Sequence, residues 1–125
     1  MRLLLDSHTL IWSLWRPSVL STTARRTIES SDNERLVSVV SLWELEIKAA
    51  AGKLTMPDDL TVAFKDVEAS LLPIEPRHLR QLRKLPFHHR DPFDRLLIAQ
   101  AVAEDLTIVT RDREFHAYGV PLLIA

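Results

Sequence analysis

The stretch from Asp91 to Asp112, DPFDRLLIAQAVAEDLTIVTRD, contains the pattern that decides the fold. Asp91 belongs to the residue types that cap helices, and Pro92 suits the first helical position. Residues from Phe93 to Ala103 are almost all apolar or alanine, which predicts a helix buried on most sides. The run from Leu106 to Val109 is too short for a helix and predicts a buried strand. A buried helix therefore turns back into a buried strand, with carboxylates at the start of the helix and just past the strand.

Short apolar runs and helical patterns alternate through the rest of the chain. The other expected strands are Arg2–Leu5, Leu36–Val40, Leu71–Ile74 and Val120–Ile124. The other expected helices are Ser7–Trp15, Ser21–Ser30, Ser41–Ala51, Pro57–Ser70 and Pro76–Lys84. This alternation predicts an α/β fold with a mostly parallel sheet covered by helices on both faces. Neither a repeat nor a linker interrupts it, so residues 1–125 are expected to form one domain.

Composition excludes several classes of protein. The chain has 125 residues, of which 46% are hydrophobic and 26% charged, as in soluble globular domains. An acid follows the first apolar run too soon for a signal peptide, and no run approaches the roughly 20 residues of a membrane span. The absence of cysteine excludes thiolate metal sites and fits a cytoplasmic protein, and two glycines are too few for a dinucleotide fingerprint or a P-loop. The formal net charge of −1 means that nucleic-acid binding requires a local basic patch.

Three acids follow the expected strands or their first connections. Asp6 follows the first strand, Glu44 lies after the second, and Asp112 comes just past Val109. Parallel strands present such groups at one edge of a sheet, where Asp94 would join them from the start of its helix. Four gathered carboxylates repel one another unless a cation neutralises them. Oxygen ligands favour Mg²⁺ or Mn²⁺, which activate water and stabilise charge on a transferring phosphoryl group.

The same acids also suit structural roles. Ser41 and Glu44 match a capping box, in which two side chains satisfy backbone N–H groups at the start of a helix. Asp94 in a first helical turn interacts favourably with the helix dipole. Asp6 and Asp112 are suited to cap the segments that follow them. The joint placement of the acids nevertheless favours a metal site.

Four motifs occur in an order and at spacings that together are specific: LLLDSHTLIW, SLWELEIKAAAGKL, LPFHHRDPFDRLLIAQA and TIVTRDREF. Nearly the whole chain thereby resembles PIN-domain ribonucleases of the kind that serve as VapC toxins in bacterial toxin–antitoxin pairs. The resemblance implies a three-layer α/β/α fold and hydrolysis of RNA by metal-activated water, leaving a 5′-phosphate and a 3′-hydroxyl. It also implies a cognate antitoxin and a homodimer as partners. The catalytic and metal-binding residues that it implies are Asp6, Glu44, Asp94 and Asp112.

Other residues are expected to support this site. Ser7, where the family usually has threonine, and Thr110 are candidate hydroxyl groups behind the ligands. Arg95 is a candidate for touching substrate or orienting a carboxylate. Asp91 belongs to the motif but is expected to be a helix cap.

A basic segment precedes and enters the central helix. It is expected to guide phosphates beside the acids, with a solvated helix face as the alternative, and consists of Arg77, Arg80, Arg83, Lys84, Arg90 and Arg95. His88 and His89 are expected to be ordinary loop residues.

Two other functions are compatible with the acids. A DNA nuclease can use the same metal chemistry, and a catalytically silent module can keep the fold for protein binding alone. A receiver-like domain needs an Asp ending the middle strand and a Lys after the last, and LLPI and PLLIA supply neither. An aspartyl phosphatase needs D-x-D after the first strand, where this chain has D-S-H.

Overall fold

Five parallel strands form one sheet in the order β3-β2-β1-β4-β5 in the computed structural model, which describes residues 1–57 and 59–125. The elements in chain order are β1 (Arg2–Leu5), α1 (Ser7–Trp15), η1 (Pro17–Val19), α2 (Thr22–Glu29), β2 (Glu34–Ser38), α3 (Val39–Ala50), α4 (Leu60–Val67), β3 (Ala69–Leu72), α5 (Pro76–Lys84), α6 (Pro92–Glu104), β4 (Thr107–Thr110), η2 (Arg113–Tyr118) and β5 (Leu122–Ile124). The prediction of an α/β fold with a mostly parallel sheet is confirmed.

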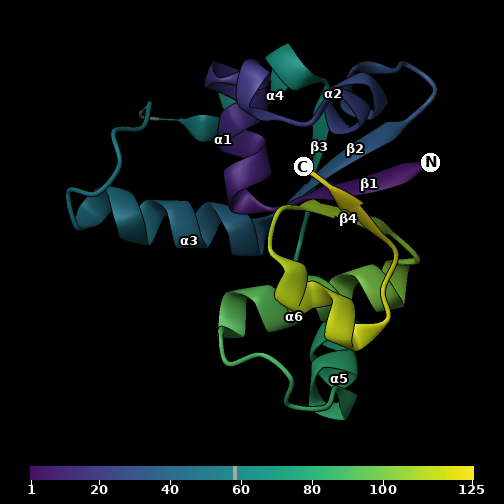
Figure 1. The fold of residues 1–125 in the computed structure, drawn as a ribbon. Helices are drawn as coiled ribbons and strands as arrows, with labels where there is room; N and C mark the ends of the chain where they lie inside the picture. Colours follow the sequence, from purple (N-terminus) through teal and green to yellow (C-terminus); the bar gives the residue numbers. More distant parts are fainter. Residues whose placement is uncertain (58) are drawn as a thin grey trace.

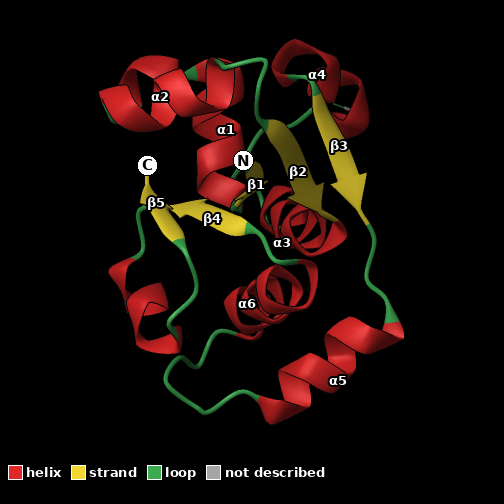
Figure 2. Cartoon of the chain, turned by 90° about the vertical axis from the view of Figure 1, so that its right-hand side faces the viewer, coloured by secondary structure: helices red, strands yellow, loops and turns green. Residues whose placement is uncertain are grey.

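Helices cover both faces of the sheet. Figures 1 and 2 show α1, α2 and α4 on one side, and α5, α6 and η2 on the other, while α3 leaves the end of β2 and projects beyond the sheet. No described helix is long and apolar enough to cross a membrane.

The core follows the alternation of side chains along the strands. In β1, Leu4 packs into the cluster formed with α6, whereas Leu3 and Leu5 pack into the cluster formed with α1, α2 and α4. All three leucines are fully buried, which explains why this central strand is continuously apolar rather than alternating. Burial of β1 on both faces fixes where its last residue, and hence Asp6, emerges from the core.

The boundary between β2 and α3 corrects one prediction. The strand ends at Ser38, and the helix begins at Val39, rather than after Val40 and at Ser41. β2 pairs with β1 only as far as Val37, beside Leu5, and the Ser38 hydroxyl then accepts a hydrogen bond from the backbone N–H of Val40 at 3.0 Å. This cap overrides the strand preference of the two valines.

As a consequence, the predicted capping box of Ser41 and Glu44 is wrong. Both residues lie inside α3, and the buried Ser41 hydroxyl makes no hydrogen bond within the described part of the chain. Glu44 is therefore free of the capping role that was its structural alternative.

The helix and the strand before α5 also have boundaries that differ from the predicted ones. The helix predicted for residues 57–70 is shorter, from Leu60 to Val67, and residue 58 lies outside the described residues. Glu68 adopts a left-handed backbone with φ of 50°, which ends the helix. The strand β3 then pairs with β2 from Ala69, two residues earlier than predicted.

Near the C-terminus, β4 starts and ends one residue later than predicted and β5 starts two residues later, at Leu122.

A buried polar connection joins β2, α6 and the segment before α5. The Ser38 hydroxyl donates to Oε1 of Gln100 at 2.5 Å, and Nε2 of Gln100 donates to the carbonyl of Pro73 at 3.2 Å. Ser38 and Gln100 are both fully buried. Because buried polar groups are costly when unpaired, this connection fixes α6 against the end of β2.

We predict that Gln100→Leu lowers the free energy of unfolding by about 1–3 kcal/mol, because the Ser38 hydroxyl and the Pro73 carbonyl lose their partner. Urea denaturation monitored by circular dichroism measures the change. Val102→Ala is the matched control, since Val102 lies 43% exposed on the same helix and should change stability by less than about 0.5 kcal/mol. Equal denaturation midpoints for Gln100→Leu and wild type would contradict this role of Gln100.

Candidate metal centre

The parallel pairing of β1 with β4 brings two of the predicted acids together. Asp6 directly follows β1, and Asp112 lies two residues beyond the end of β4. Between them, the buried Thr110 hydroxyl donates to Oδ2 of Asp6 at 2.6 Å and accepts from the backbone N–H of Asp112 at 3.1 Å. Thr110 therefore orients both acids from behind.

Asp6 is at once a helix cap and a member of this cluster. Its Oδ1 accepts a hydrogen bond from the backbone N–H of Thr9 at 2.8 Å, which caps α1. Asp112 similarly caps η2 by accepting from the N–H of Glu114 at 2.9 Å. Each carboxylate oxygen has two lone pairs, so capping leaves acceptor capacity for a cation. The capping roles and a metal-binding role are compatible.

Glu44 reaches the same edge from the second turn of α3. The hydroxyl of Ser7, next to Asp6 in sequence, donates to Oε1 of Glu44 at 2.7 Å. Lys48, one turn further along α3, approaches Oε2 of Glu44 at 3.6 Å. Ser7 thus connects the end of β1 to α3, and Lys48 compensates part of the local negative charge.

Asp94 lies in the first turn of α6, which Asp91 caps by accepting from the N–H groups of Phe93 and Asp94 at 2.8 and 3.2 Å. Burial raises the pKa of Asp94 to about 7, together with the negative charges of Asp91, Glu44 and Asp112 and against the opposing effect of His89. The part of this shift that comes from neighbouring carboxylates is the part that a bound cation would offset.

His89, expected to be an ordinary loop residue, points into the acids. Its Nε2 lies 3.2 Å from Oδ2 of Asp94, 3.3 Å from Oδ2 of Asp112 and 3.1 Å from Oε2 of Glu114. Its Nδ1 accepts from the backbone N–H of Asp91 at 3.1 Å, which places the proton of the neutral ring on Nε2. Burial lowers the pKa of His89, but the hydrogen bond to Asp112 and the charges of Asp94 and Glu114 outweigh it and raise the pKa. The ring is thus a resident hydrogen-bond donor among the carboxylates.

Neither His89 nor Glu114 was a predicted member of the cluster. The sequence offers weak signals for both, since His89 lies two residues before Asp91, and Glu114 lies two residues after Asp112. Neither spacing indicates which way a loop side chain points. The packing of the loop beside η2 decides that direction.

The residues fit a divalent cation bound mainly by oxygen. Asp94, Asp112 and Glu114 converge on a single imidazole N–H, and Glu44 has one lysine beside it. The negative charge therefore exceeds the positive charge that these neighbours supply. Carboxylates in excess over nearby cations are the ligand set that Mg²⁺ and Mn²⁺ prefer.

Arg95 lies beside Asp94 in sequence but its side chain contacts another part of the molecule. It is buried and donates to the carbonyl of Pro86 at 2.8 Å and to the hydroxyl of Tyr118 at 3.1 Å. No hydrogen bond joins it to the acids in the described residues. Arg95 therefore stabilises the loop that precedes α6 and does not orient a carboxylate of the cluster.

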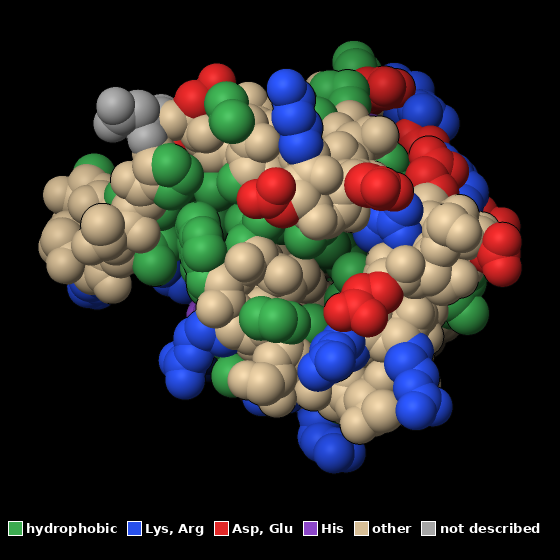
Figure 3. All heavy atoms as spheres, turned by 90° about the horizontal axis from the view of Figure 1, so that it is seen from above, with side chains coloured by type: hydrophobic (Ala, Val, Ile, Leu, Met, Phe, Trp, Pro, Cys, Tyr) green, Lys and Arg blue, Asp and Glu red, His purple; other side chains and the backbone are tan. Residues whose placement is uncertain are grey.

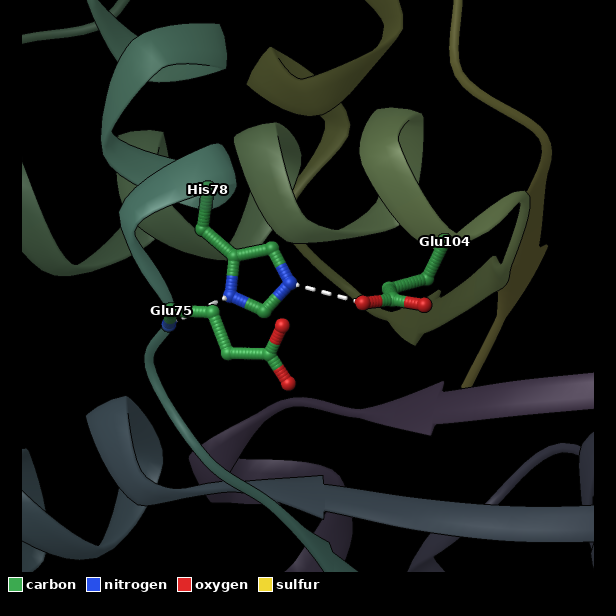
Figure 4. Close-up of side chains that lie close together, drawn as sticks. All are labelled: Glu75, His78 and Glu104. Atoms are coloured by element: carbon green, nitrogen blue, oxygen red, sulfur yellow. Dashed lines mark hydrogen bonds and ion pairs between the residues drawn. The ribbon is translucent and has the colours of Figure 1, made fainter.

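A second group with suitable metal ligands lies between α5 and α6 and serves the fold. Figure 4 shows the fully buried His78 between Glu75 and Glu104. Nδ1 of His78 accepts from the N–H of Glu75 at 3.0 Å, and Nε2 lies 2.8 Å from Oε1 of Glu104. The hydrogen bond from His78 lowers the pKa of Glu104, burial opposes this, and Arg77 lowers it further. Because Arg77 also pairs with Glu75 and Glu104, this group already contains its cation.

The chain matches the PIN domain family model over residues 3–121, and it therefore belongs to the PIN domain family. It is 29% identical to "Ribonuclease VapC22" of Mycobacterium tuberculosis over 121 residues, covering 94% of this chain and 92% of that protein.

Solved structures share the fold. VapBC2 from Rickettsia felis bound to a promoter DNA fragment matches with a TM-score of 0.71 and 14% identity, covering 98% of each chain. VapBC-5 from Mycobacterium tuberculosis, a toxin–antitoxin system, matches with a TM-score of 0.61 and 20% identity, covering 99% of this chain and 98% of that chain.

We predict that Asp94→Asn stabilises the metal-free protein at about pH 8, where wild-type Asp94 is ionised among like charges. The folded pKa of about 7 exceeds the ordinary 3.8, so wild-type stability falls as pH rises between these values. After allowance for partial exposure, the variant should gain about 1–2 kcal/mol at high pH, which corresponds to roughly 4–8 °C in melting temperature. At about pH 4 it should gain little.

Thermal melts in EDTA at both pH values measure this difference. Asp66→Asn, at an exposed position on α4, is the control and should melt like wild type at both. Addition of Mn²⁺ should raise the melting temperature of wild type and not that of Asp94→Asn. A variant that is less stable than wild type at high pH would contradict the like-charge environment of Asp94.

Proposed function

We propose that this PIN domain is a metal-dependent endoribonuclease that hydrolyses RNA phosphodiester bonds as the toxin of a toxin–antitoxin pair in the cytoplasm. The observation that carries the proposal is the approach of Asp94, Asp112 and Glu114 to within 3.3 Å of Nε2 of His89. Beside them, the Thr110 hydroxyl connects the Asp6 carboxylate to the backbone N–H of Asp112. The resemblance to Ribonuclease VapC22 supports RNA as the substrate.

Four residues would hold the metal in this proposal: Asp6, Glu44, Asp94 and Asp112. When bound, Mg²⁺ or Mn²⁺ supplies an activated water and stabilises negative charge on the phosphate. Thr110 holds Asp6 and the backbone of Asp112 in place, and Ser7 holds Glu44. Lys48 limits the repulsion that Glu44 experiences before a cation binds. His89 hydrogen-bonds Asp112 through Nε2 and lies 3.2 Å from Asp94, so its ring links the two carboxylates.

A protein partner is part of the proposal. The solved neighbours include VapBC complexes, and Figure 3 shows hydrophobic side chains gathered on the face covered by α1 and α4, on the side towards which α3 projects. Trp15 of α1 and Val62 of α4 line one shallow hollow and are 46% and 61% exposed. We propose that a cognate antitoxin covers these apolar groups, and that the active chain forms a homodimer.

We predict that the purified, partner-free protein cuts single-stranded RNA into discrete fragments with Mn²⁺ and not with EDTA. Asp94→Asn should reduce the cleavage rate by at least about a hundredfold, because it removes a charged ligand. Asp91→Asn is the matched control: asparagine also caps helices, so this variant should stay within about tenfold of wild type. Gel electrophoresis of labelled RNA measures all three rates.

The same assay with a DNA strand of identical sequence distinguishes the two nucleases. Preferential cleavage of DNA would replace the ribonuclease proposal by the DNA nuclease alternative. Failure of a folded, metal-loaded sample to cut either strand would favour a catalytically silent protein-binding module.

A further inference from the structure

Phe87 is the most exposed large hydrophobic side chain among the described residues, with 89% of its surface open to solvent. It lies in the loop between α5 and α6, within the segment that carries His89 into the acids. A single exposed apolar side chain is common on protein surfaces, so the significance of Phe87 depends on the groups around it.

The rear of the Phe87 ring is supported by a buried cation. The guanidinium carbon of Arg95 lies 4.2 Å from the centre of the ring. Arg95 is itself fixed by the carbonyl of Pro86 and the hydroxyl of Tyr118, at 2.8 and 3.1 Å. One face of the ring therefore stacks on a positioned guanidinium, and the ring leaves most of its surface to solvent.

Tyr118 also fixes the backbone of the loop. Its hydroxyl accepts hydrogen bonds from the backbone N–H groups of His88 and His89, at 3.1 and 2.9 Å. The ring of His88 packs edge-on against that of Tyr118, with centroids 5.2 Å apart. The loop that presents Phe87 is thus held in place before any ligand arrives, which lowers the entropic cost of binding.

The ring borders a basic hollow of about 760 Å³. Its lining residues are Leu82, Arg83, Phe87, His88, His89, Arg90, Pro92 and Arg95, with no acid among them. Arg83 and Arg90 are exposed. The same His89 that lines this hollow contacts Asp94 and Asp112, so the hollow adjoins the candidate metal centre directly.

We propose that this hollow is a nucleotide subsite, in which an unpaired base of a single-stranded RNA stacks on Phe87 while Arg83 and Arg90 contact the adjoining phosphates. The inference rests on the proposed ribonuclease function and identifies where the substrate is held. An aromatic ring with flanking arginines is a general means of binding single-stranded RNA. The excess of positive charge favours a polyanion over an apolar protein surface as the occupant.

The test is fluorescence anisotropy with a short, labelled single-stranded RNA of random sequence, in Ca²⁺ and in parallel in EDTA. Phe87→Ala should weaken binding about tenfold, because the base loses the aromatic ring on which it stacks. Phe87→Trp should bind at least as tightly as wild type. Leu79→Ala is the matched control: Leu79 is 49% exposed on α5, outside the hollow, and its loss should leave binding unchanged.

Salt dependence separates stacking from charge. Phe87→Ala should keep the wild-type slope of log affinity against log salt, whereas Arg83→Gln should reduce its magnitude by roughly one unit. A ring that merely maintained the fold would change the melting temperature as well, and Phe87→Ala should melt like wild type.

Three results would overturn the subsite. Wild-type affinity in Phe87→Ala, with RNA binding intact, would exclude stacking while leaving the ribonuclease proposal standing. A change in oligomeric state of Phe87→Ala on size-exclusion chromatography would assign the ring to a contact between proteins. Failure of the wild-type protein to bind RNA under either condition would instead contradict the proposed function and the subsite with it.

Discussion

The hydrogen bond from Thr110 to Asp6 connects the fold to the candidate metal centre. It exists because β1 and β4 are parallel neighbours, with Leu5 paired to Val109, so that both strands end at the same edge. A single hydroxyl then orients Asp6 and, through its backbone N–H, Asp112. The buried leucines of β1 maintain this register, because a slip by one residue would turn Leu3 and Leu5 to the opposite face. The position of the acids is therefore a consequence of core packing.

The protein gathers like charges at this edge at a cost in stability. The raised pKa of Asp94 reflects its burial first and these like charges second, and His89 offsets part of the shift. Lys48 approaches Glu44, and Nε2 of His89 hydrogen-bonds Asp112 and lies within 3.2 Å of Asp94 and Glu114. Between α5 and α6, by contrast, His78 and Arg77 satisfy both nearby glutamates. The difference between the two groups is one of degree: one arginine pairs with both glutamates between α5 and α6, whereas the larger group of acids at the sheet edge has one lysine and one histidine beside it.

The sequence predicted the sheet and the acids because both depend on simple periodic patterns. Alternation of apolar runs with helical patterns sufficed for the parallel sheet, and the position of Asp6 after an apolar run sufficed to place it at the edge. The boundaries of α3 and β3 were wrong because tertiary pairing and local caps, at Ser38 and Glu68, outweighed residue preference.

The directions of the side chains at the start of α6 and in the loop before it could not be predicted from the sequence, for a different reason. His89 and Arg95 flank the same acids, yet His89 points into the cluster, whereas Arg95 turns back to Pro86 and Tyr118. Their opposite directions depend on Tyr118, which is remote in sequence and binds the loop through backbone N–H groups. Hydrophobic periodicity along the chain carries no information about a contact of this kind.

The most direct test of the central claim, that the uncompensated acids hold a divalent cation, is an anomalous difference map from crystals soaked in Mn²⁺. The account predicts a peak bounded by the carboxylates of Asp6, Glu44, Asp94 and Asp112. A map with no peak there, or with its peak at Glu75, His78 and Glu104, would contradict it.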